Sequence, residues 1–255
     1  MRSLLLPIAL VAFAGVAQAQ FMPEKLTPIG EQIVAAMNSD IRTAEEKDRD
    51  AERKPRQTLE FFGLQDNMRV LELVPAGGWF TKIIAPVVAE KGELYVAIGT
   101  DRLEPVLKAT PSLSKVRVAP VDAKMAPAPN KMGQFDLGDF SLGVKDMDLI
   151  LTFRNYHNLT TAARGSLNKA AFAALKSGGH YGILDHTRRH NEPDNTENWR
   201  RVDPVLVIKE VQAAGFILED FSGLHYTPDD ELRYEVARKS VTGNSDRIVL
   251  RFRKP

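Results

Sequence analysis

Cysteine is absent from this 255-residue chain, which excludes disulfide bridges, thiolate chemistry and an acylated lipoprotein cysteine. Neither sign of charge dominates, because 34 Lys and Arg stand against 33 Asp and Glu. Such a balance gives no indication of nucleic acid or an anionic membrane as the main partner. The chain also lacks Gly-x-Ser-x-Gly and Gly-x-x-x-x-Gly-Lys-Ser/Thr motifs, so neither a hydrolase elbow nor a P-loop is supported.

Long apolar runs are missing as well, except at the amino terminus. Met1–Arg2 is a short positive region, Leu4–Val16 is almost wholly apolar, and Ala-Gln-Ala at 17–19 is a small-x-small cleavage site. This order predicts a signal peptide over 1–19, with the mature chain beginning at Gln20. A retained membrane anchor is the alternative, but the run is shorter than the roughly 20 residues that a span needs. The sequence favours a periplasmic or secreted protein of bacterial type.

The remaining chain is long enough for one large domain. Removing 19 of the 255 residues leaves 236, which supports a full hydrophobic core. Residues 20–42 are expected to form a tether and a helix, and residues 43–255 the main domain. Apolar strands then alternate with helices, which is typical of a doubly wound, mostly parallel α/β sheet. The expected strands are 68–74, 93–98, 116–121, 148–153, 181–185, 216–223 and 247–253, the last two forming a pair with an antiparallel edge strand. The expected helices are 79–89, 103–108, 162–175 with a stop at Gly178-Gly179, and 204–214 with a cap at Gly215.

A highly charged run lies between residues 43 and 62. It predicts a helix that Pro55 breaks or kinks. Few apolar residues anchor this helix, so one interpretation is an exposed, solvated face. The other interpretation is a lid over a ligand cleft, in which Arg49 and Arg53 would face an anionic ligand.

The most informative segment is 70–81, where a buried strand, an acid, a Gly-containing turn and a helix start follow one another. In an α/β protein this order builds a cradle for a nucleotide or cofactor. The acid, Glu72, binds ribose hydroxyls, and glycines such as Gly77 and Gly78 let backbone N–H groups approach the ligand. A solvated strand-end acid is the alternative for Glu72. Trp79, which follows, either lines the cradle or packs the helix onto the sheet.

A second polar group follows the apolar strand at 148–153. Arg154 and His157 lie just past it, where burying an unpaired charge is costly, so a role in a site is favoured. Asp185 and His186 end the next strand and reach the same rim, because the carboxyl ends of parallel strands meet at one edge. His157 or His186 would act as a general base. Asp185 either orients substrate or makes structural hydrogen bonds.

Metal binding has one possible source in the sequence. Asp185-His186-x-x-x-His190 offers a carboxylate and two imidazoles at a helical spacing. The intervening Thr-Arg-Arg is basic, however, and the region from 187 to 203 reads as a polar loop. We therefore predict no metal site here.

Four segments of the chain carry a resemblance to a known family. They are Thr58–Gly63, Val70–Pro86, Leu149–Asn158 with its Thr-Phe-Arg-Asn-x-His-Asn run, and Leu175–Gly179 leading into Ile183–His186. Together with the order of elements, they resemble the class I S-adenosylmethionine-dependent methyltransferases, which have a seven-stranded Rossmann-like sheet. More narrowly, residues 45–220 resemble a group of secreted bacterial proteins described as predicted methyltransferases.

The resemblance implies an enzyme that uses S-adenosylmethionine to methylate a small molecule, with no nucleic acid and no membrane beyond export. Asp122 would bond the adenine amine, although a turn-capping role is its alternative. Asp101 is the carboxylate nearest the place of the acid that ends the second strand. The implied cofactor residues are Glu72, Gly77, Gly78, Trp79, Asp101, Asp122, Ala123 and Thr152. The implied catalytic residues are Arg154, His157 and His186. The oligomeric state is left open.

The sequence departs from the family pattern at two places. Val74 and Ala76 stand where a Gly-x-Gly-x-Gly loop has its first two glycines, and Ile98 or Gly99 replaces the acid that ends the second strand. These departures favour an alternative function. The chain would then be a secreted, non-catalytic protein that binds a small metabolite on a methyltransferase scaffold.

Overall fold

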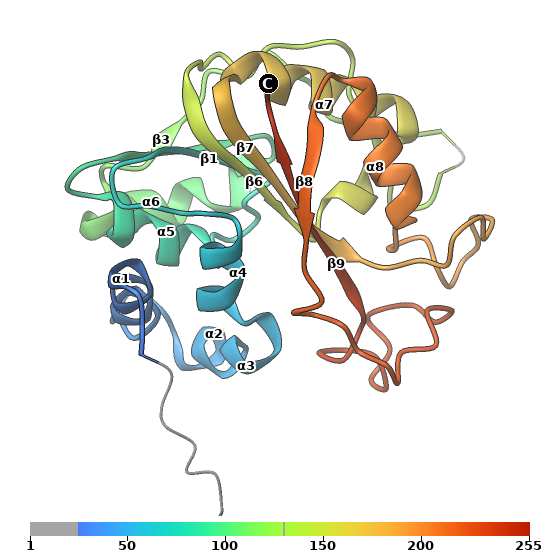
Figure 1. The fold of residues 1–255 in the computed structure, drawn as a ribbon, viewed down its shortest axis with the longest axis horizontal. Helices are drawn as coiled ribbons and strands as arrows, with labels where there is room; N and C mark the ends of the chain where they lie inside the picture. Colours follow the sequence, from blue (N-terminus) through green and yellow to red (C-terminus); the bar gives the residue numbers. More distant parts are fainter. Residues whose placement is uncertain (1–24, 130) are drawn as a thin grey trace, which may run out of the picture.

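The computed structural model describes residues 25–129 and 131–255; the predicted signal peptide lies outside them. One sheet has seven strands in the order β3-β2-β1-β6-β7-β9-β8 (Figure 1). All neighbours pair in parallel except those of β9, which is antiparallel to β7 and to the edge strand β8. The predicted seven-stranded Rossmann-like sheet, with an antiparallel pair at its edge, is confirmed. The strands are β1 (Arg69–Leu73), β2 (Glu93–Ala97), β3 (Arg117–Val118), β6 (Met147–Phe153), β7 (Leu175–His186), β8 (Ile217–Phe221) and β9 (Arg247–Arg253).

Helices cover both faces of this sheet, because successive strand residues point to opposite sides. On β1, Leu71 and Leu73 belong to one apolar cluster and Val70 to the other. The first cluster includes Leu167 of α7 (Thr161–Ala174) and Val207 of α8 (Pro204–Ala213). The second includes residues of α1 (Pro28–Met37), α4 (Pro55–Phe61) and α5 (Thr81–Val88), with α6 (Glu104–Ala109) packed against it. Burying each such Leu or Val stabilises the fold by about 1.5–3 kcal/mol.

Short elements complete the connections. The 3-10 helices are η1 (Thr100–Arg102), η2 (Pro111–Leu113) and η3 (Tyr156–Asn158). A separate two-stranded antiparallel pair, β4 (Ala126–Pro127) with β5 (Phe135–Asp136), lies within the long connection between β3 and β6. Within the described part of the chain, no helix has both the length and the apolar character needed to cross a bilayer.

The predicted helix stop at Gly178-Gly179 is wrong. The helix α7 already ends at Ala174, and β7 begins at Leu175 and continues through both glycines. Gly178 has a φ of 76°, and its N–H donates to the Lys254 carbonyl at 2.9 Å, while the Lys254 N–H donates to the Gly179 carbonyl at 2.9 Å. Pairing with the end of the chain therefore decides the conformation of this glycine pair.

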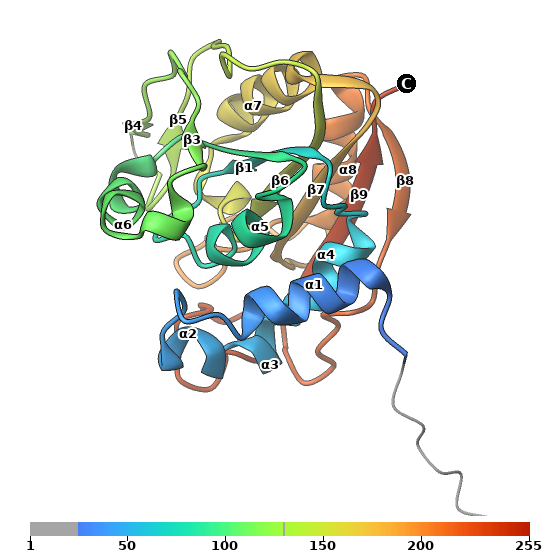
Figure 2. The same cartoon turned by 90° about the vertical axis from the view of Figure 1, so that its left-hand side faces the viewer.

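The charged run after residue 43 forms three short helices, α2 (Ala44–Asp48), α3 (Asp50–Arg53) and α4. The predicted break is confirmed, because Lys54 has a φ of 42° and Pro55 is the first residue of α4. Figures 1 and 2 show these helices beside the long segment after β8. Two hydrogen bonds join them, from Lys54 Nζ to the Leu224 carbonyl at 2.7 Å and from Arg247 Nη1 to the Glu52 carbonyl at 2.8 Å. The helices thus lie at the carboxyl ends of the parallel strands.

Candidate functional site

A cavity of about 550 Å³ lies at the carboxyl ends of β1 and β6, within the size range of small-molecule sites. Its walls come from the loop after β1, the residues after β6, helices α2 and α3, and the loop after β7. The position agrees with the rule that α/β proteins bind ligands beyond the carboxyl ends of their strands. Six of the predicted site residues line it: Glu72, Gly77, Trp79, Arg154, His157 and His186.

Glu72 is a buried acid on the floor of this cavity. Glu72 is only 3% exposed, so its interpretation as a solvated acid at the end of a strand is wrong. Thr81 Oγ1 donates a hydrogen bond to Glu72 Oε2 at 2.6 Å. Burial raises the pKa of this carboxyl to about 8, against which the Thr81 bond is a smaller, opposite effect. At neutral pH Glu72 is therefore protonated and can itself donate a hydrogen bond.

The loop after β1 keeps left-handed backbone conformations at the positions where glycines are missing. Val74 and Ala76 have φ values of 51° and 52°. Each such residue costs about 1–2 kcal/mol in strain relative to glycine. At Gly78, the φ of 83° would strain any other residue, and a Cβ there would lie 2.5 Å from Leu103 Cδ1, so the leucine side chain would have to move. At Gly77, which lines the cavity, no atom of the described residues lies within 4 Å of an added Cβ, so the loop backbone is open at this point.

Asn155 fixes this loop to the end of β6. Its Nδ2 donates to the Val74 carbonyl at 2.9 Å and to the Phe153 carbonyl at 3.1 Å. Asn155 also lines the cavity. Asn155 belongs to the Thr-Phe-Arg-Asn-x-His-Asn run, but the run assigns it no role, because the amide of an asparagine gives no sign of its partner.

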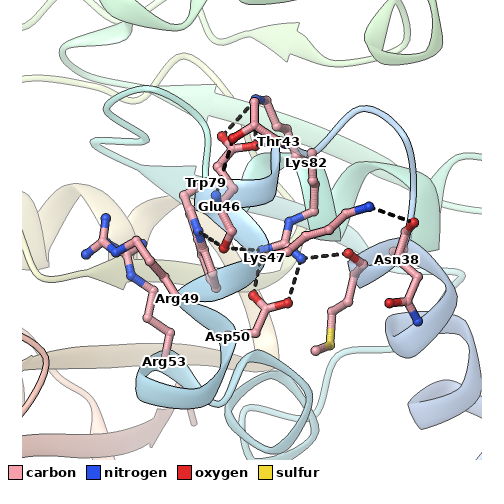
Figure 3. Close-up of polar contacts among 12 residues, drawn as sticks. Asn38, Thr43, Glu46, Lys47, Arg49, Asp50, Arg53, Trp79 and Lys82 are labelled. Atoms are coloured by element: carbon pink, nitrogen blue, oxygen red, sulfur yellow. Dashed lines mark hydrogen bonds and ion pairs between the residues drawn. The ribbon is translucent and has the colours of Figure 1, made fainter.

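Trp79 connects the same loop to α2 and α3 (Figure 3). Its Nε1 donates to the Glu46 carbonyl at 3.0 Å, and the Arg53 guanidinium lies 4.4 Å from the ring centroid. The Glu46 carboxylate pairs with Lys82 Nζ at 2.8 and 3.0 Å. These contacts hold α2 and α3 over the cavity, whose lining includes Arg49 and Arg53.

His157 and Asp185 form a buried pair at the opposite wall. His157 Nδ1 lies 2.6 Å from Asp185 Oδ1, and the His157 backbone N–H donates to Asp185 Oδ2 at 3.0 Å. A carboxylate accepts only, so Nδ1 carries a proton, and in the neutral ring Nε2 then has a free lone pair. Among residues 25–129 and 131–255, no hydrogen bond engages that Nε2. The pair can therefore accept a proton from a ligand in the cavity.

His186 is occupied at both ring nitrogens. Arg154 Nε donates to His186 Nε2 at 3.0 Å, so the proton sits on Nδ1, which lies 2.7 Å from Ser245 Oγ. Burial, followed by the nearby Arg154 charge, lowers the pKa of His186 well below its ordinary value. A neutral histidine with both nitrogens engaged has no free position for a substrate proton. The geometry thus favours His157 over His186 as a base, and gives His186 the role of orienting Arg154.

Five of the predicted cofactor residues do not line the cavity: Gly78, Asp101, Asp122, Ala123 and Thr152. Asp122 is exposed and accepts the Ser141 N–H at 2.8 Å, a structural hydrogen bond to a segment 19 residues further along the chain. Asp101 is exposed in η1. Thr152 is fully buried within β6, opposite Leu73 and Ile183 of the neighbouring strands. The expected contacts of these side chains with a cofactor are not supported by this arrangement.

Other lining residues come from segments far away in the sequence. Trp199 and Arg200 lie in the loop after β7, and Val236 lies in the segment after β8. They follow no local motif, because only the tertiary fold brings these loops to the cavity. In the described residues, no group of three or more carboxylate, imidazole or thiol side chains is arranged to hold a metal ion.

Comparison with known proteins finds similar folds but no similar sequence family. No protein-family model matches the chain, and no curated protein matches its sequence. Solved structures do match. A SAM-dependent methyltransferase from Aquifex aeolicus is 14% identical and aligns with a TM-score of 0.52 over 88% of this chain and 97% of its own. The chain has the class I methyltransferase fold.

Two further structures agree on this fold and differ in activity. The [4+2]-cyclase SpnF is 16% identical, with a TM-score of 0.54 over 86% of each chain. Human N-acetylserotonin methyltransferase, solved with SAM, is 12% identical, with a TM-score of 0.50 over 89% of this chain and 56% of its own. At such identities the likeness shows the fold alone, and the function has to be argued from the site.

Proposed function

We propose that this protein is an S-adenosylmethionine-dependent methyltransferase that acts on a small molecule. One observation carries the proposal: the cavity at the carboxyl ends of β1 and β6 has a glycine-loop-like wall on one side and the His157–Asp185 pair on the other. A cofactor cradle and a proton acceptor thus share one small-molecule cavity. The class I fold of the chain is consistent with this activity.

The residues present fit the cofactor at the loop after β1. The open space at Gly77 lets a ligand lie against the backbone, and the protonated Glu72 offers a hydrogen bond. The loop at 74–77 and the indole of Trp79 would complete this wall. S-adenosylmethionine, when bound, supplies an electrophilic methyl group on its sulfonium.

The chain's own contribution is to position an acceptor and to remove its proton. His157 Nε2 would take that proton, and Asp185 holds the ring in the required tautomer and stabilises the resulting imidazolium. General-base catalysis of this kind contributes about 10²–10⁴-fold. Positioning of the acceptor in the cavity supplies a further part of the rate.

A methyl-transfer assay tests the proposal. The protein is incubated with methyl-labelled S-adenosylmethionine and a small-metabolite extract, and labelled products are counted. His157→Gln should lower the rate by about 10²-fold or more. His190→Gln is the matched control, because His190 also pairs with a carboxylate, Asp203 at 2.9 Å, but does not line the cavity. No labelled product from the wild-type protein, or equal rates for both variants, would contradict the assignment.

One observation favours a second candidate, a non-catalytic protein that binds a small metabolite. Asp101 and Asp122, the carboxylates expected to hold the cofactor's adenosine, both lie outside the cavity. On this account the same cavity binds another metabolite and transfers no methyl group. The protein would then bind neither S-adenosylmethionine nor S-adenosylhomocysteine while remaining folded.

We further propose that the protein is exported and belongs with the secreted group it resembles, with α2 and α3 serving as a lid. The support for export is the order of charged, apolar and small residues in 1–19. Amino-terminal sequencing of the protein purified from a bacterial host should give Gln20 as the first residue. Recovery of a chain that still begins at Met1 would contradict the export proposal.

A further inference from the structure

The cavity wall formed by α3 and the end of β6 has a large excess of positive charge. Arg49, Arg53 and Arg154 line the cavity, and Arg247 donates from Nη1 to the backbone carbonyl of Glu52 at 2.8 Å. The Glu52 carboxylate lies 3.0 Å from Arg49 Nη2 and 3.5 Å from Arg53 Nε. We call these four arginines the guanidinium cluster; Glu52 is the carboxylate within it.

Several N–H groups of the cluster are buried without a hydrogen-bond partner. They include Arg154 Nη1, Arg53 Nε and Arg247 Nε. Burial, together with the neighbouring arginine charges, lowers the pKa of Arg53 to about 9 and that of Arg247 to about 10. Each of these side chains has a partner through another atom or a longer contact, but a buried N–H group of a cation that donates no hydrogen bond is costly. A ligand that accepts hydrogen bonds and carries negative charge would remove this cost.

Among the described residues, the other acids near this wall are already engaged, including Asp185, which pairs with His157. The Glu46 carboxylate already pairs with Lys82, and Glu72 is protonated. Arg200, a further cation on the wall, has its own partner in Glu235 at 3.3 Å. The unmatched charge that faces the cavity therefore lies on Arg49, Arg53 and Arg154, with Arg102, an exposed residue of η1, as the remaining lining arginine.

We propose that the guanidinium cluster binds an oxyanionic group, a carboxylate or a phosphate, carried by the methyl acceptor. Planar guanidinium groups match both oxyanions in geometry as well as charge. Arg154 also bonds to His186, whose ring lies 5.9 Å from that of His157. An anion held by Arg154 would thus place its molecule beside the proposed base. This assignment of the acceptor class rests on the proposed methyltransferase function.

The cofactor's own carboxylate is a weaker match to the cluster. S-adenosylmethionine also carries a sulfonium and an ammonium, so its net charge does not offset several guanidinium groups. An anionic acceptor bound beside it would balance the charge of the cavity. An acceptor site and a cofactor-carboxylate site can be told apart by measurement, because only the acceptor site stays available to an anion when S-adenosylhomocysteine is bound.

Calorimetry with inorganic phosphate and with malonate, at low ionic strength, tests the proposal on the full mature chain. Each anion is titrated with and without saturating S-adenosylhomocysteine. Arg49→Gln and the double variant Arg49→Gln/Arg53→Gln should weaken anion binding by about tenfold or more. The Arg49 side chain is 44% exposed, so this change should leave the fold intact. Arg233→Gln is the matched control, with a 60% exposed side chain away from the cavity. Circular dichroism checks the fold of each variant.

The proposal expects at least one anion to bind the wild-type protein, with S-adenosylhomocysteine present, and to bind Arg233→Gln equally well. Absence of binding, or equal binding to the folded double variant, would overturn the anion site. Loss of anion binding on adding S-adenosylhomocysteine would assign the cluster to the cofactor carboxylate and overturn the acceptor site. Anion binding to a protein that does not bind S-adenosylhomocysteine would contradict the proposed function but uphold the oxyanion site.

Discussion

Replacing Ala76 with glycine should stabilise this protein, although Ala→Gly changes usually destabilise. Ala76 has a φ of 52°, a region where a side chain with a Cβ is strained. Relief of that strain is worth about 1–2 kcal/mol. The greater freedom of glycine in the unfolded chain costs about 0.5–1 kcal/mol. With the middle of each range, about 1.5 and about 0.75 kcal/mol, the net expectation is a gain of about 0.75 kcal/mol in the free energy of unfolding.

Thermal and urea unfolding measure this gain. For a chain of this size, about 1 kcal/mol shifts Tm by roughly 2–4 °C, so Ala76→Gly should raise Tm by about 1–4 °C. Ala35→Gly is the control, because Ala35 is exposed within the regular helix α1. There the same chemical change should lower the free energy of unfolding by about 0.5–1 kcal/mol.

The two variants should thus move in opposite directions. If Ala76→Gly lowered Tm as much as Ala35→Gly, the loop would not hold the left-handed conformation at residue 76. Val74 is less suitable for this test, although its φ is 51°. Its side chain packs against the core, so removing it would lose burial as well as strain.

Two further predictions concern buried groups around the cavity. The folded protein keeps the Glu72 proton until its pKa of about 8, whereas the unfolded chain loses it near 4.5; wild-type stability should therefore fall as pH rises between these values. Glu72→Gln removes that titration. Between pH 5 and pH 8, the free energy of unfolding of the variant, measured in urea, should therefore rise by up to about 4 kcal/mol relative to that of the wild type. If the difference between the two proteins were the same at both pH values, Glu72 would be ionised in the folded protein. Trp79→Phe deletes the indole N–H bond to the Glu46 carbonyl, worth about 1 kcal/mol, and should speed tryptic cleavage after Arg49 and Arg53. Cleavage at the wild-type rate would show that Trp79 does not hold α2 and α3.

The fold follows from local sequence patterns because strand and helix periodicity are local properties. Apolar runs located the seven strands, and Pro55 located the break before α4, since its ring fixes φ and removes a donor. The exception was the end of α7. There a Gly-Gly pair is typical of a helix stop, but Gly179 pairs with Lys254 and both glycines belong to β7. The sequence around the glycines does not indicate this distant partner.

The site was only partly predictable for a related reason. Glu72, Arg154 and His157 directly follow or end strands whose carboxyl ends meet, so topology alone brings them together. Asp122 was placed by analogy, whereas its carboxylate accepts a hydrogen bond from the backbone N–H of Ser141, which lies 19 residues further along the chain. Arg200 lies within the long loop after β7, and no pattern in the sequence specifies that this loop reaches the cavity.

Binding of S-adenosylhomocysteine, measured by calorimetry, tests the central claim most directly. The wild-type protein should bind it in the micromolar range. Gly77→Leu should abolish binding, because Gly77 lines the cavity and no described atom lies within 4 Å of an added Cβ, so the leucine side chain would fill space beside the ligand. Gly138→Leu is the matched control, with equally free space but away from the cavity, and Asp122→Ala should also bind normally. A folded wild-type protein that binds neither S-adenosylhomocysteine nor S-adenosylmethionine, or a Gly77→Leu variant that binds as well as Gly138→Leu, would contradict the account.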